Sequence, residues 1–378
     1  MVALAAMAAT VAITAGSLGP GAGAAAEPAG QPAASGPLRP NVVMIMLDDI
    51  NPHDGRLWER MPTIAREFVS QGVEFTDFHG ETPTCSPGRV GFLTGLHTNA
   101  HRVTRNNARL FKPGMTFATQ MRKRNYHTIF GGKYLNAYEF LSDKTPLGWS
   151  RFHGMGGDYY NYPLWSNGRR EFHGRKPRDY STDVIRRKVL ASIRTAPRKK
   201  RLLALITPWA SHVPRTPAPR HRNDPRCEGI PRWKPANFME ANVRDKPAYI
   251  RRAPITQTKG YGLRKICRTM LSVDQLLAGV VRELKKQGRY NNTLFILTAD
   301  NGMNFGAHRL LEDKKTPFAT QLPFYMAWPK VLGSQPRQIN ERLQNIDLAP
   351  TLCQLAGCRM GPYPTGQRRA CLLYTSDA

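Results

Sequence analysis

Two short apolar runs, each ending in polar side chains, constrain the fold of this chain more than any other feature. The run NVVMIMLDDI occupies residues 41–50, and the run NTLFILTADNG occupies residues 292–302. Nearly continuous apolar runs of this length are typical of strands buried on both faces of a parallel sheet. The side chains that follow the two runs are Asp48, Asp49, Asp300 and Asn301. Because sites in such sheets gather beyond the carboxyl ends of strands, these four residues are candidate site residues.

Segments with helical periodicity alternate with the apolar runs. Apolar residues recur at helical intervals over residues 265–287, and Gly288 ends that segment. Residues 61–75 show a helical spacing followed by a new strand. Residues 115–136 are predicted to form a helix, a turn, a strand and then a Gly-Gly-Lys loop. The alternation predicts an α/β fold with a central, mostly parallel sheet that is flanked by helices.

A third apolar run, RLLALITPWASHVP at residues 201–214, predicts a buried strand followed by a loop that carries His212. Residues 214–252 are rich in proline and arginine and show little periodicity, which favours a long surface loop or insertion. Hard oxygen ligands at the ends of two buried strands suit Ca²⁺ or Mg²⁺ better than a soft metal. A single Asp-Asp or Asp-Asn-Gly sequence is more often a turn, so the argument depends on the two runs together.

The charge of the chain is strongly positive. It has 55 Lys and Arg residues against 27 Asp and Glu residues, and its formal net charge is +28. Such an excess attracts polyanions, whether nucleic acid, anionic lipid or sulfated glycan. No aromatic platform or recognisable nucleic-acid-binding module accompanies the charge, so specific nucleic-acid binding is not expected.

The first residues predict export. Residues 1–26 carry no charge and are too short and too rich in Ala and Gly for a good membrane span, which is typical of a secretory signal that lacks its basic start. An Ala-rich leader without a targeting role is the alternative. Residues 27–39 are predicted to be a linker, and residues 367–378 a truncation or an artefactual tail. The expected location is extracellular, without a transmembrane anchor.

None of the six cysteines has the Cys-x-x-Cys spacing of a metal site; they are Cys85, Cys227, Cys267, Cys353, Cys358 and Cys371. In an exported protein, Cys353 with Cys358 and Cys227 with Cys267 would be plausible disulfides, although the sequence alone does not fix the pairing. Cys85 is then the odd one out. Pro87 suits the first turn of a helix, so residue 85 is expected at a helix N-terminus, where free N–H groups favour an anion.

The segment CSPGR, residues 85–89, resembles the Cys-x-Pro-x-Arg signature of type I sulfatases, which belong to the alkaline-phosphatase superfamily. In that family the cysteine is oxidised after translation to Cα-formylglycine (3-oxoalanine). Further segments resemble the family in the same order: VVMIMLDDI, CSPGRVGFLTG, GGKYLN, SHVPRTPAPRH and ADNGMNFGAHRLLEDKKTPF. The resemblance extends over residues 40–366, and GKYLN with TPAPRH resembles the branch that contains N-acetylglucosamine-6-sulfatases.

The resemblance implies a role for each site residue. The hydrated aldehyde at residue 85 would be the nucleophile, and Arg89 would stabilise it. Lys133 would contact the sulfate. His212 would be a general acid for the leaving oxygen or a hydrogen-bond donor to the sulfate. Ca²⁺, or else Mg²⁺, would be held by Asp48, Asp49, Asp300, Asn301 and the group derived from Cys85. Lys314 matches the family lysine two residues before Thr-Pro, with Lys315 as a competing match, and His308 would border the site.

The implied function is hydrolysis of a sulfate ester in a sulfated sugar or glycosaminoglycan, after maturation by a formylglycine-generating enzyme. A phosphate or phosphonate monoester hydrolase with the same nucleophile is a close alternative. A catalytically silent protein that binds sulfated glycans is a second one. The chain departs from the family at Gly88, where a Ser or Ala is usual, and at Leu135, where many members have His. The family's C-terminal subdomain is expected to be short or truncated.

Overall fold

The structure is a computed structural model that describes residues 37–52, 56–138, 144–314, 316–361 and 365–369. The predicted signal peptide lies outside the described residues, as do residues 27–36 of the predicted linker and residues 370–378 of the predicted tail. No helix in the described part of the chain combines the length and the apolar character that crossing a membrane requires.

A ten-stranded sheet forms the centre of the described chain, in the order β11-β2-β10-β9-β1-β8-β4-β5-β6-β7. The strands are β1 (Asn41–Leu47), β2 (Val73–Phe75), β4 (Tyr126–Lys133), β5 (Arg151–Met155), β6 (Tyr162–Ser166), β7 (Arg169–His173), β8 (Arg201–Thr207), β9 (Thr293–Ala299), β10 (Tyr325–Ala327) and β11 (Arg337–Ile339). β1 pairs in parallel with both β8 and β9, whereas β10, β6 and β7 pair antiparallel. A separate two-stranded sheet joins β3 (Phe78–His79) to β12 (Leu343–Gln344).

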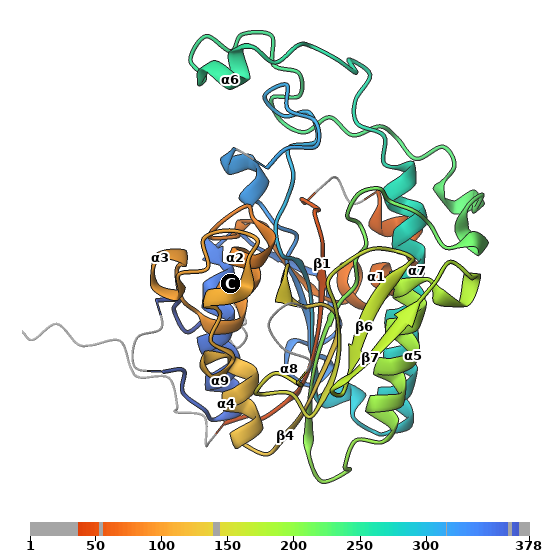
Figure 1. Ribbon diagram of the computed structural model, residues 1–378, viewed down its shortest axis with the longest axis vertical. Helices are drawn as coiled ribbons and strands as arrows, with labels where there is room; N and C mark the ends of the chain where they lie inside the picture. Colours follow the sequence, from red (N-terminus) through yellow and green to blue (C-terminus); the bar gives the residue numbers. More distant parts are fainter. Residues whose placement is uncertain (1–36, 53–55, 139–143, 315, 362–364, 370–378) are drawn as a thin grey trace, which may run out of the picture. The chain divides into compact units, whose positions relative to one another are not determined.

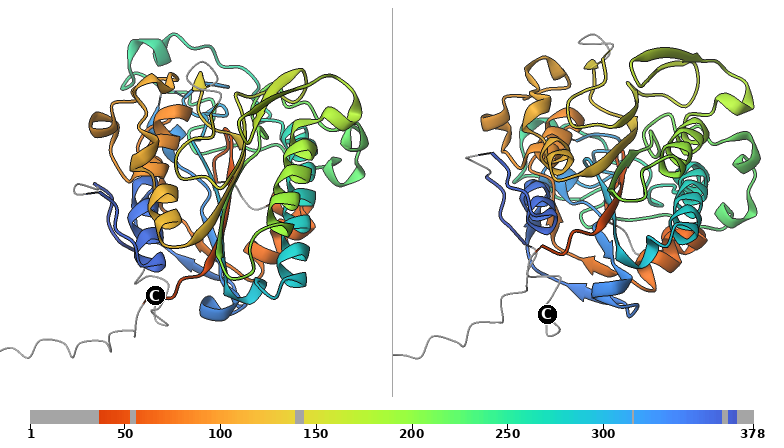
Figure 2. Two further views of the ribbon diagram at one scale, coloured as in Figure 1. Left: turned by 60° about the horizontal axis from the view of Figure 1, so that its bottom comes forward. Right: turned by 90° about the horizontal axis from the view of Figure 1, so that it is seen from below.

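Helices cover both faces of the large sheet. They are α1 (Pro62–Ile64), α2 (Cys85–Thr94), α3 (Thr98–His101), α4 (Phe117–Lys123), α5 (Ser181–Arg194), α6 (Ala248–Arg251), α7 (Arg264–Lys286), α8 (Pro329–Leu332) and α9 (Leu348–Ala356). α2, α4 and α9 lie on one face, and α1, α5 and α7 lie on the other (Figures 1 and 2). This arrangement confirms the predicted α/β fold with a central sheet flanked by helices.

The elements that bury the most apolar sequence are those that the pattern predicted. Every residue of β1 and of β9 is buried, which agrees with a strand covered on both faces. α7 begins one residue before the predicted helix 265–287 and ends one residue earlier. α7 packs against α5 and α1, and basic residues occupy its last turn.

The Gly-Gly-Lys segment is not the predicted loop. Gly131, Gly132 and Lys133 are the last three residues of strand β4. Gly132 has a φ of +126°, and a Cβ atom there would lie 2.0 Å from the carbonyl oxygen of Thr207 in the neighbouring strand. The glycine therefore serves a close approach between two strands, whereas its sequence signal is that of a loop.

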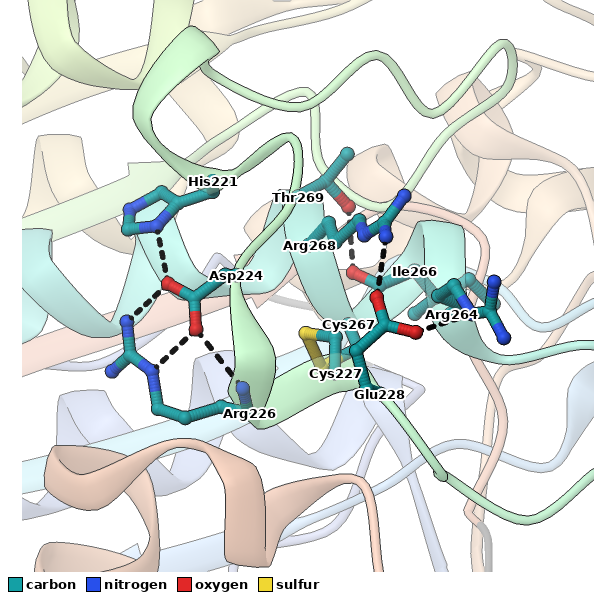
Figure 3. Close-up of a disulfide and its surroundings, with 10 residues drawn as sticks. All are labelled: His221, Asp224, Arg226, Cys227, Glu228, Arg264, Ile266, Cys267, Arg268 and Thr269. Carbon is teal, nitrogen blue, oxygen red and sulfur yellow. Dashed lines mark hydrogen bonds and ion pairs between the residues drawn. A yellow bond between two sulfur atoms is a disulfide. The ribbon is translucent and has the colours of Figure 1, made fainter.

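The predicted insertion at 214–252 is mostly irregular, with short helical turns, of which α6 is one. A disulfide between Cys227 and Cys267 ties it to α7 (Figure 3). Beside the disulfide, Arg268 on α7 lies 2.6 Å from Glu228 in an ion pair (Figure 3). The second predicted pair, Cys353 with Cys358, is also joined. Both expected pairings are thus confirmed, and Cys85 is a free cysteine among the described residues.

Candidate active site

The ends of β1 and β9 bring the predicted acidic residues together. The two strands pair in parallel with Leu47 opposite Ala299, so the residues that follow them leave the sheet at the same edge. These residues are Asp48, Asp49, Asp300 and Asn301, and all four side chains are buried. The helix α2, which starts at Cys85, lies on one side of this edge and carries Arg89 one turn further on (Figure 1).

Two buried cations neutralise Asp48. Arg89 Nη2 lies 3.0 Å and Lys133 Nζ lies 2.7 Å from Asp48 Oδ2. Arg89 Nε donates to Asp300 Oδ2 at 2.8 Å, and its Nη1 donates to the carbonyl oxygen of Lys133. Burial would raise the pKa of Asp48, but Lys133 and Arg89 hold that pKa well below its usual range. Arg89 therefore joins four elements of the site: α2, β4 and the ends of β1 and β9.

Cys85 is the first residue of α2 and is almost completely buried. Lys314 Nζ lies 3.4 Å from its Sγ, and Asp48 Oδ1 lies 3.9 Å from the same atom. Burial raises the pKa of the Cys85 thiol to about 12, although Lys133 opposes that shift. A cysteine that attacks as a thiolate normally has a lowered pKa, so these surroundings are not those of a conventional nucleophilic thiol.

Asp49 contacts the residues on the other side of the cluster. Its Oδ1 accepts a hydrogen bond from Asn301 Nδ2 at 2.7 Å and forms an ion pair with Lys314. Its Oδ2 lies 3.5 Å from His212 Nε2. Burial and the charge of Asp48 raise the pKa of Asp49, so the two adjacent carboxyl groups have opposite shifts. Lys314 is therefore brought into the cluster, whereas Lys315 is outside the described residues.

Two buried oxygens in this cluster have no hydrogen-bond partner: Asp49 Oδ2 and Asn301 Oδ1. A buried acceptor without a partner is costly, and a bound cation removes that cost. Asp48, Asp49 and Cys85 offer ligand atoms that lie within 4.8 Å of one another. A set made mainly of carboxylate and amide oxygens fits a hard divalent cation such as Ca²⁺ or Mg²⁺.

The loop after β8 positions His212 and contributes a residue that the sequence analysis missed. His212 Nδ1 lies 2.7 Å from the carbonyl oxygen of Val213, which can only accept, so this nitrogen carries a proton. The centroid of the Trp209 ring lies 4.0 Å from the centroid of the His212 ring. It lies 4.6 Å from Lys133 Nζ. Trp209 precedes His212 by three residues in the loop that follows a buried strand, and that position is the signal that could have identified it.

His308 is not brought to the carboxylate cluster by any described contact. Its Nδ1 lies 2.8 Å from Glu240 Oε2, and its backbone N–H donates to Asn237 at 2.9 Å. Both partners belong to the insertion that covers this end of the sheet. The expectation that His308 borders the site stays a prediction.

The packing of α2 explains why residue 88 is a glycine. A Cβ atom at this position would lie 2.6 Å from the carbonyl oxygen of Asp300. In addition, Asn345 Nδ2 donates to the carbonyl oxygen of Gly88 at 3.1 Å. α2 thus packs directly against the end of β9, and the residue without a side chain permits that approach.

Comparison with solved structures places this fold in a known class. A structure of BT4656 in complex with its substrate D-glucosamine-2-N,6-O-disulfate has a TM-score of 0.71 at 20% identity, and the match covers 90% of this chain and 82% of that one. A phosphonate monoester hydrolase from Silicibacter pomeroyi has a TM-score of 0.62 at 18% identity, covering 90% and 78%. These neighbours share the alkaline-phosphatase-like architecture of a large sheet flanked by helices.

The sequence also matches the Sulfatase family model over residues 40–358, and this chain belongs to that family. It is 32% identical over 352 residues to the N-acetylglucosamine-6-sulfatase of Capra hircus and 31% identical over 351 residues to that of Homo sapiens. It is 30% identical over 344 residues to the extracellular sulfatase SULF-1 homolog of Drosophila melanogaster. These matches cover 84–86% of this chain but only 62% of the goat and human proteins and 30% of the fly protein.

Proposed function

We propose that this protein hydrolyses sulfate esters of sulfated sugars, with residues 40–366 as the catalytic domain. The observation that carries the proposal is the position of Cys85. It is a free, buried cysteine at the start of α2, and its sulfur lies 3.4 Å from Lys314 Nζ and 3.9 Å from Asp48 Oδ1. A group derived from this side chain would face fixed cations and a cation site at once.

Two groups complete the proposed site: Cα-formylglycine at residue 85 and a divalent cation, Ca²⁺ or Mg²⁺. The former would supply a hydrated aldehyde as the nucleophile toward the ester sulfur, and the latter would supply positive charge for the sulfate oxygens. Asp48, Asp49, Asp300 and Asn301 would hold the cation together with residue 85. Asp49 Oδ2 and Asn301 Oδ1, which accept no hydrogen bond among the described residues, support this assignment.

The fixed cations of the chain would bind and orient the sulfate. Lys133, paired with Asp48, and Lys314, next to Cys85, would bind the sulfate oxygens and stabilise the negative charge of the transferring group. Arg89 would fix the position of residue 85 relative to the carboxylates, because its guanidinium contacts both Asp48 and Asp300. These contacts are made before substrate binds, so little reorganisation is needed.

His212 would donate a proton to the leaving sugar oxygen. Its Nδ1 is engaged with the carbonyl oxygen of Val213, so its Nε2 is the atom available for transfer. Nε2 lies 3.5 Å from Asp49 Oδ2, so the ring faces the carboxylate cluster. Trp209 packs on the imidazole and limits its rotation.

The substrate class that we propose is a 6-O-sulfated glucosamine, alone or within a glycosaminoglycan. Two relatives at 31–32% identity are N-acetylglucosamine-6-sulfatases, and BT4656 was solved with a glucosamine disulfate. We also propose that the protein is exported and matured by a formylglycine-generating enzyme. Two disulfides and the likeness to extracellular sulfatases of fly and worm support export.

The test begins with mass spectrometry of the tryptic peptide 67–89, which contains Cys85. We expect an aldehyde in place of the thiol when the protein is made in a host with the converting enzyme. Purified protein should release sulfate from glucosamine-6-sulfate and from an aryl sulfate, and Cys85→Ala should not. Chelation should abolish turnover, and Ca²⁺ or Mg²⁺ should restore it.

Two outcomes would contradict the proposal. Faster hydrolysis of the phosphate monoester than of the sulfate monoester of the same phenol would indicate a phosphate or phosphonate hydrolase. A converted, folded and metal-loaded protein that binds heparin but releases no sulfate would indicate a silent binding protein.

A further inference from the structure

A polar pocket lies beside the candidate active site. Its volume is about 300 Å³, and its lining residues are Asp158, Tyr159, Tyr160, Asn161, Arg175 and Thr216. This volume is at the lower end of the range of roughly 300–1,000 Å³ found for pockets that hold small organic ligands. Aromatic walls with a few convergent polar groups are typical of such pockets.

The pocket and the active site share two loops. The hydroxyl of Tyr159 donates to the carbonyl oxygen of His212 at 2.7 Å, so one wall of the pocket is bonded to the backbone of the proposed general acid. Thr216, on another wall, follows His212 by four residues. On the other loop, Gly157 precedes Asp158 and packs against the ring of Trp209, which in turn lies over Lys133. A ligand in the pocket would therefore lie next to a substrate in the active site.

The cationic group of the pocket, Arg175, suits an anionic sugar. Arg175 is exposed and, within the described residues, makes no hydrogen bond or ion pair through its guanidinium. By contrast, Arg220, which is not among the lining residues, is engaged by both oxygens of Asp183. Arg175 is the arginine among the lining residues, and its guanidinium can bind a carboxylate or a sulfate with two parallel hydrogen bonds.

The remaining lining groups suit the neutral part of a sugar. Asp158 is exposed, and one of its oxygens accepts from the backbone N–H of Tyr159 at 2.6 Å, which fixes the carboxylate in place. Carboxylate and amide groups such as Asp158 and Asn161 bind hydroxyls. The half-buried ring of Tyr160 packs edge-on against Tyr180 at 5.5 Å and offers a fixed apolar wall for a sugar ring.

We propose that this pocket binds the sugar that neighbours the one losing its sulfate, and that Arg175 selects a neighbour bearing a carboxylate or a sulfate. This inference rests on the proposed function, because it assigns a second subsite to the same substrate. The protein would then act best on acidic oligosaccharides, with the neighbouring sugar held in the pocket while the sulfated one lies against residue 85.

The test compares matched substrates and matched variants. The substrates are glucosamine-6-sulfate, a disaccharide that links it to a hexuronic acid, and the same disaccharide with its carboxyl group reduced to an alcohol. The variants are Arg175→Gln and Arg169→Gln, because Arg169 is an exposed arginine of strand β7 outside the pocket. A third disaccharide, with a 2-O-sulfate on the carboxyl-reduced sugar, separates sulfate recognition from carboxylate recognition.

For Arg175→Gln we expect kcat/KM to fall about ten-fold on a disaccharide whose neighbouring sugar is acidic, which corresponds to about 1.4 kcal/mol. The monosaccharide and the carboxyl-reduced disaccharide without a 2-O-sulfate should change less than about two-fold, as should every substrate with Arg169→Gln. An equal loss on all substrates, or no loss on either acidic disaccharide, would overturn the inference.

Binding to the Cys85→Ala protein separates this inference from the proposed function. Titration calorimetry with the acidic disaccharide should show an affinity that Arg175→Gln lowers about ten-fold and that Arg169→Gln leaves unchanged. This result would support the subsite even in a protein that releases no sulfate. Equal affinities in the Arg175→Gln and Arg175 proteins would refute it even if the protein is an active sulfatase.

Discussion

At Gly88 the absence of a side chain sets the distance between α2 and the end of β9. A Cβ atom there would lie 2.6 Å from the carbonyl oxygen of Asp300, and a backbone atom cannot move aside without moving the strand end. The residues on either side are Cys85, which α2 positions, and Asp300, which Arg89 binds. A side chain at residue 88 would therefore change the positions of Cys85 and Asp300 relative to each other.

We predict that Gly88→Ala lowers the free energy of unfolding by about 1–3 kcal/mol, the usual cost of overpacking. It should also lower kcat more than KM is raised, because α2 and its Cys85 move away from the strand ends. Chemical denaturation and sulfate release measure the two effects. The matched control is Gly114→Ala, since the nearest atom to a Cβ there lies 4.0 Å away. Equal stability and activity in the two variants would contradict this account of Gly88.

The residues of the cluster differ in how far the sequence could predict them. Asp48, Asp49, Asp300 and Asn301 could be placed together because each pair follows a buried strand, and parallel strands end at one edge. Trp209 also follows a buried strand, but its contact with Lys133 depends on how closely the loop after β8 approaches the end of β4, which the sequence pattern does not determine. The choice of Lys314 also depends on tertiary packing, since its neighbour Lys315 has the same chemistry.

At the scale of the elements, His153 joins strand β5 to its neighbours. Its Nδ1 lies 2.9 Å from Ser166 Oγ on β6, and its Nε2 lies 2.9 Å from Ser192 Oγ on α5. Burial, together with the charge of Lys188, lowers the pKa of His153 to about 4. An unfolded chain has a histidine pKa of about 6.5. Stability rises with pH wherever the unfolded chain binds more protons, so the contribution is complete above about pH 6.5 and is lost as pH falls to about 4.

We predict that the free energy of unfolding falls between pH 6.5 and pH 4 and that His153→Gln removes up to about 3 kcal/mol of this fall. The variant should be less stable than the parent at neutral pH, because it loses a hydrogen bond between β5 and its neighbours. Denaturant titrations at a series of pH values measure the slope. His97→Gln serves as the control, because the His97 side chain is 41% exposed. An unchanged slope in His153→Gln would show that this histidine does not link stability to pH.

The prediction of secondary structure failed where glycines that usually indicate a loop lie inside a strand. Residues 131–133 read as a loop because two glycines adjoin a lysine, yet they complete β4 and bring Lys133 to the site. Glycine is rare inside strands, but here Gly132 permits the close approach of β8, and Gly131 permits the close approach of Val189 on α5. The long helix α7 and the buried strands β1 and β9 were predictable, because their periodicity extends over whole elements.

At the scale of the whole molecule, the net charge of +28 acts on any anionic substrate before it reaches the site. Many of the cations on the described surface are exposed, so salt screens them efficiently: the Debye length is about 10 Å at 0.1 M ionic strength. The attraction therefore raises the rate at which substrate and protein meet, rather than the stability of the bound complex. It should grow with the number of charges that the substrate carries.

We predict that kcat/KM falls with ionic strength more steeply for a sulfated tetrasaccharide than for a singly charged aryl sulfate. Between about 20 and 200 mM salt, the tetrasaccharide should lose about ten-fold and the aryl sulfate about two-fold, because screening acts on each substrate charge. Steady-state kinetics at constant pH and saturating Ca²⁺ measure both slopes, and kcat serves as the internal control because it should stay constant. Equal slopes would mean that the positive surface contributes nothing to substrate capture and that the cations around residue 85 alone attract the sulfate.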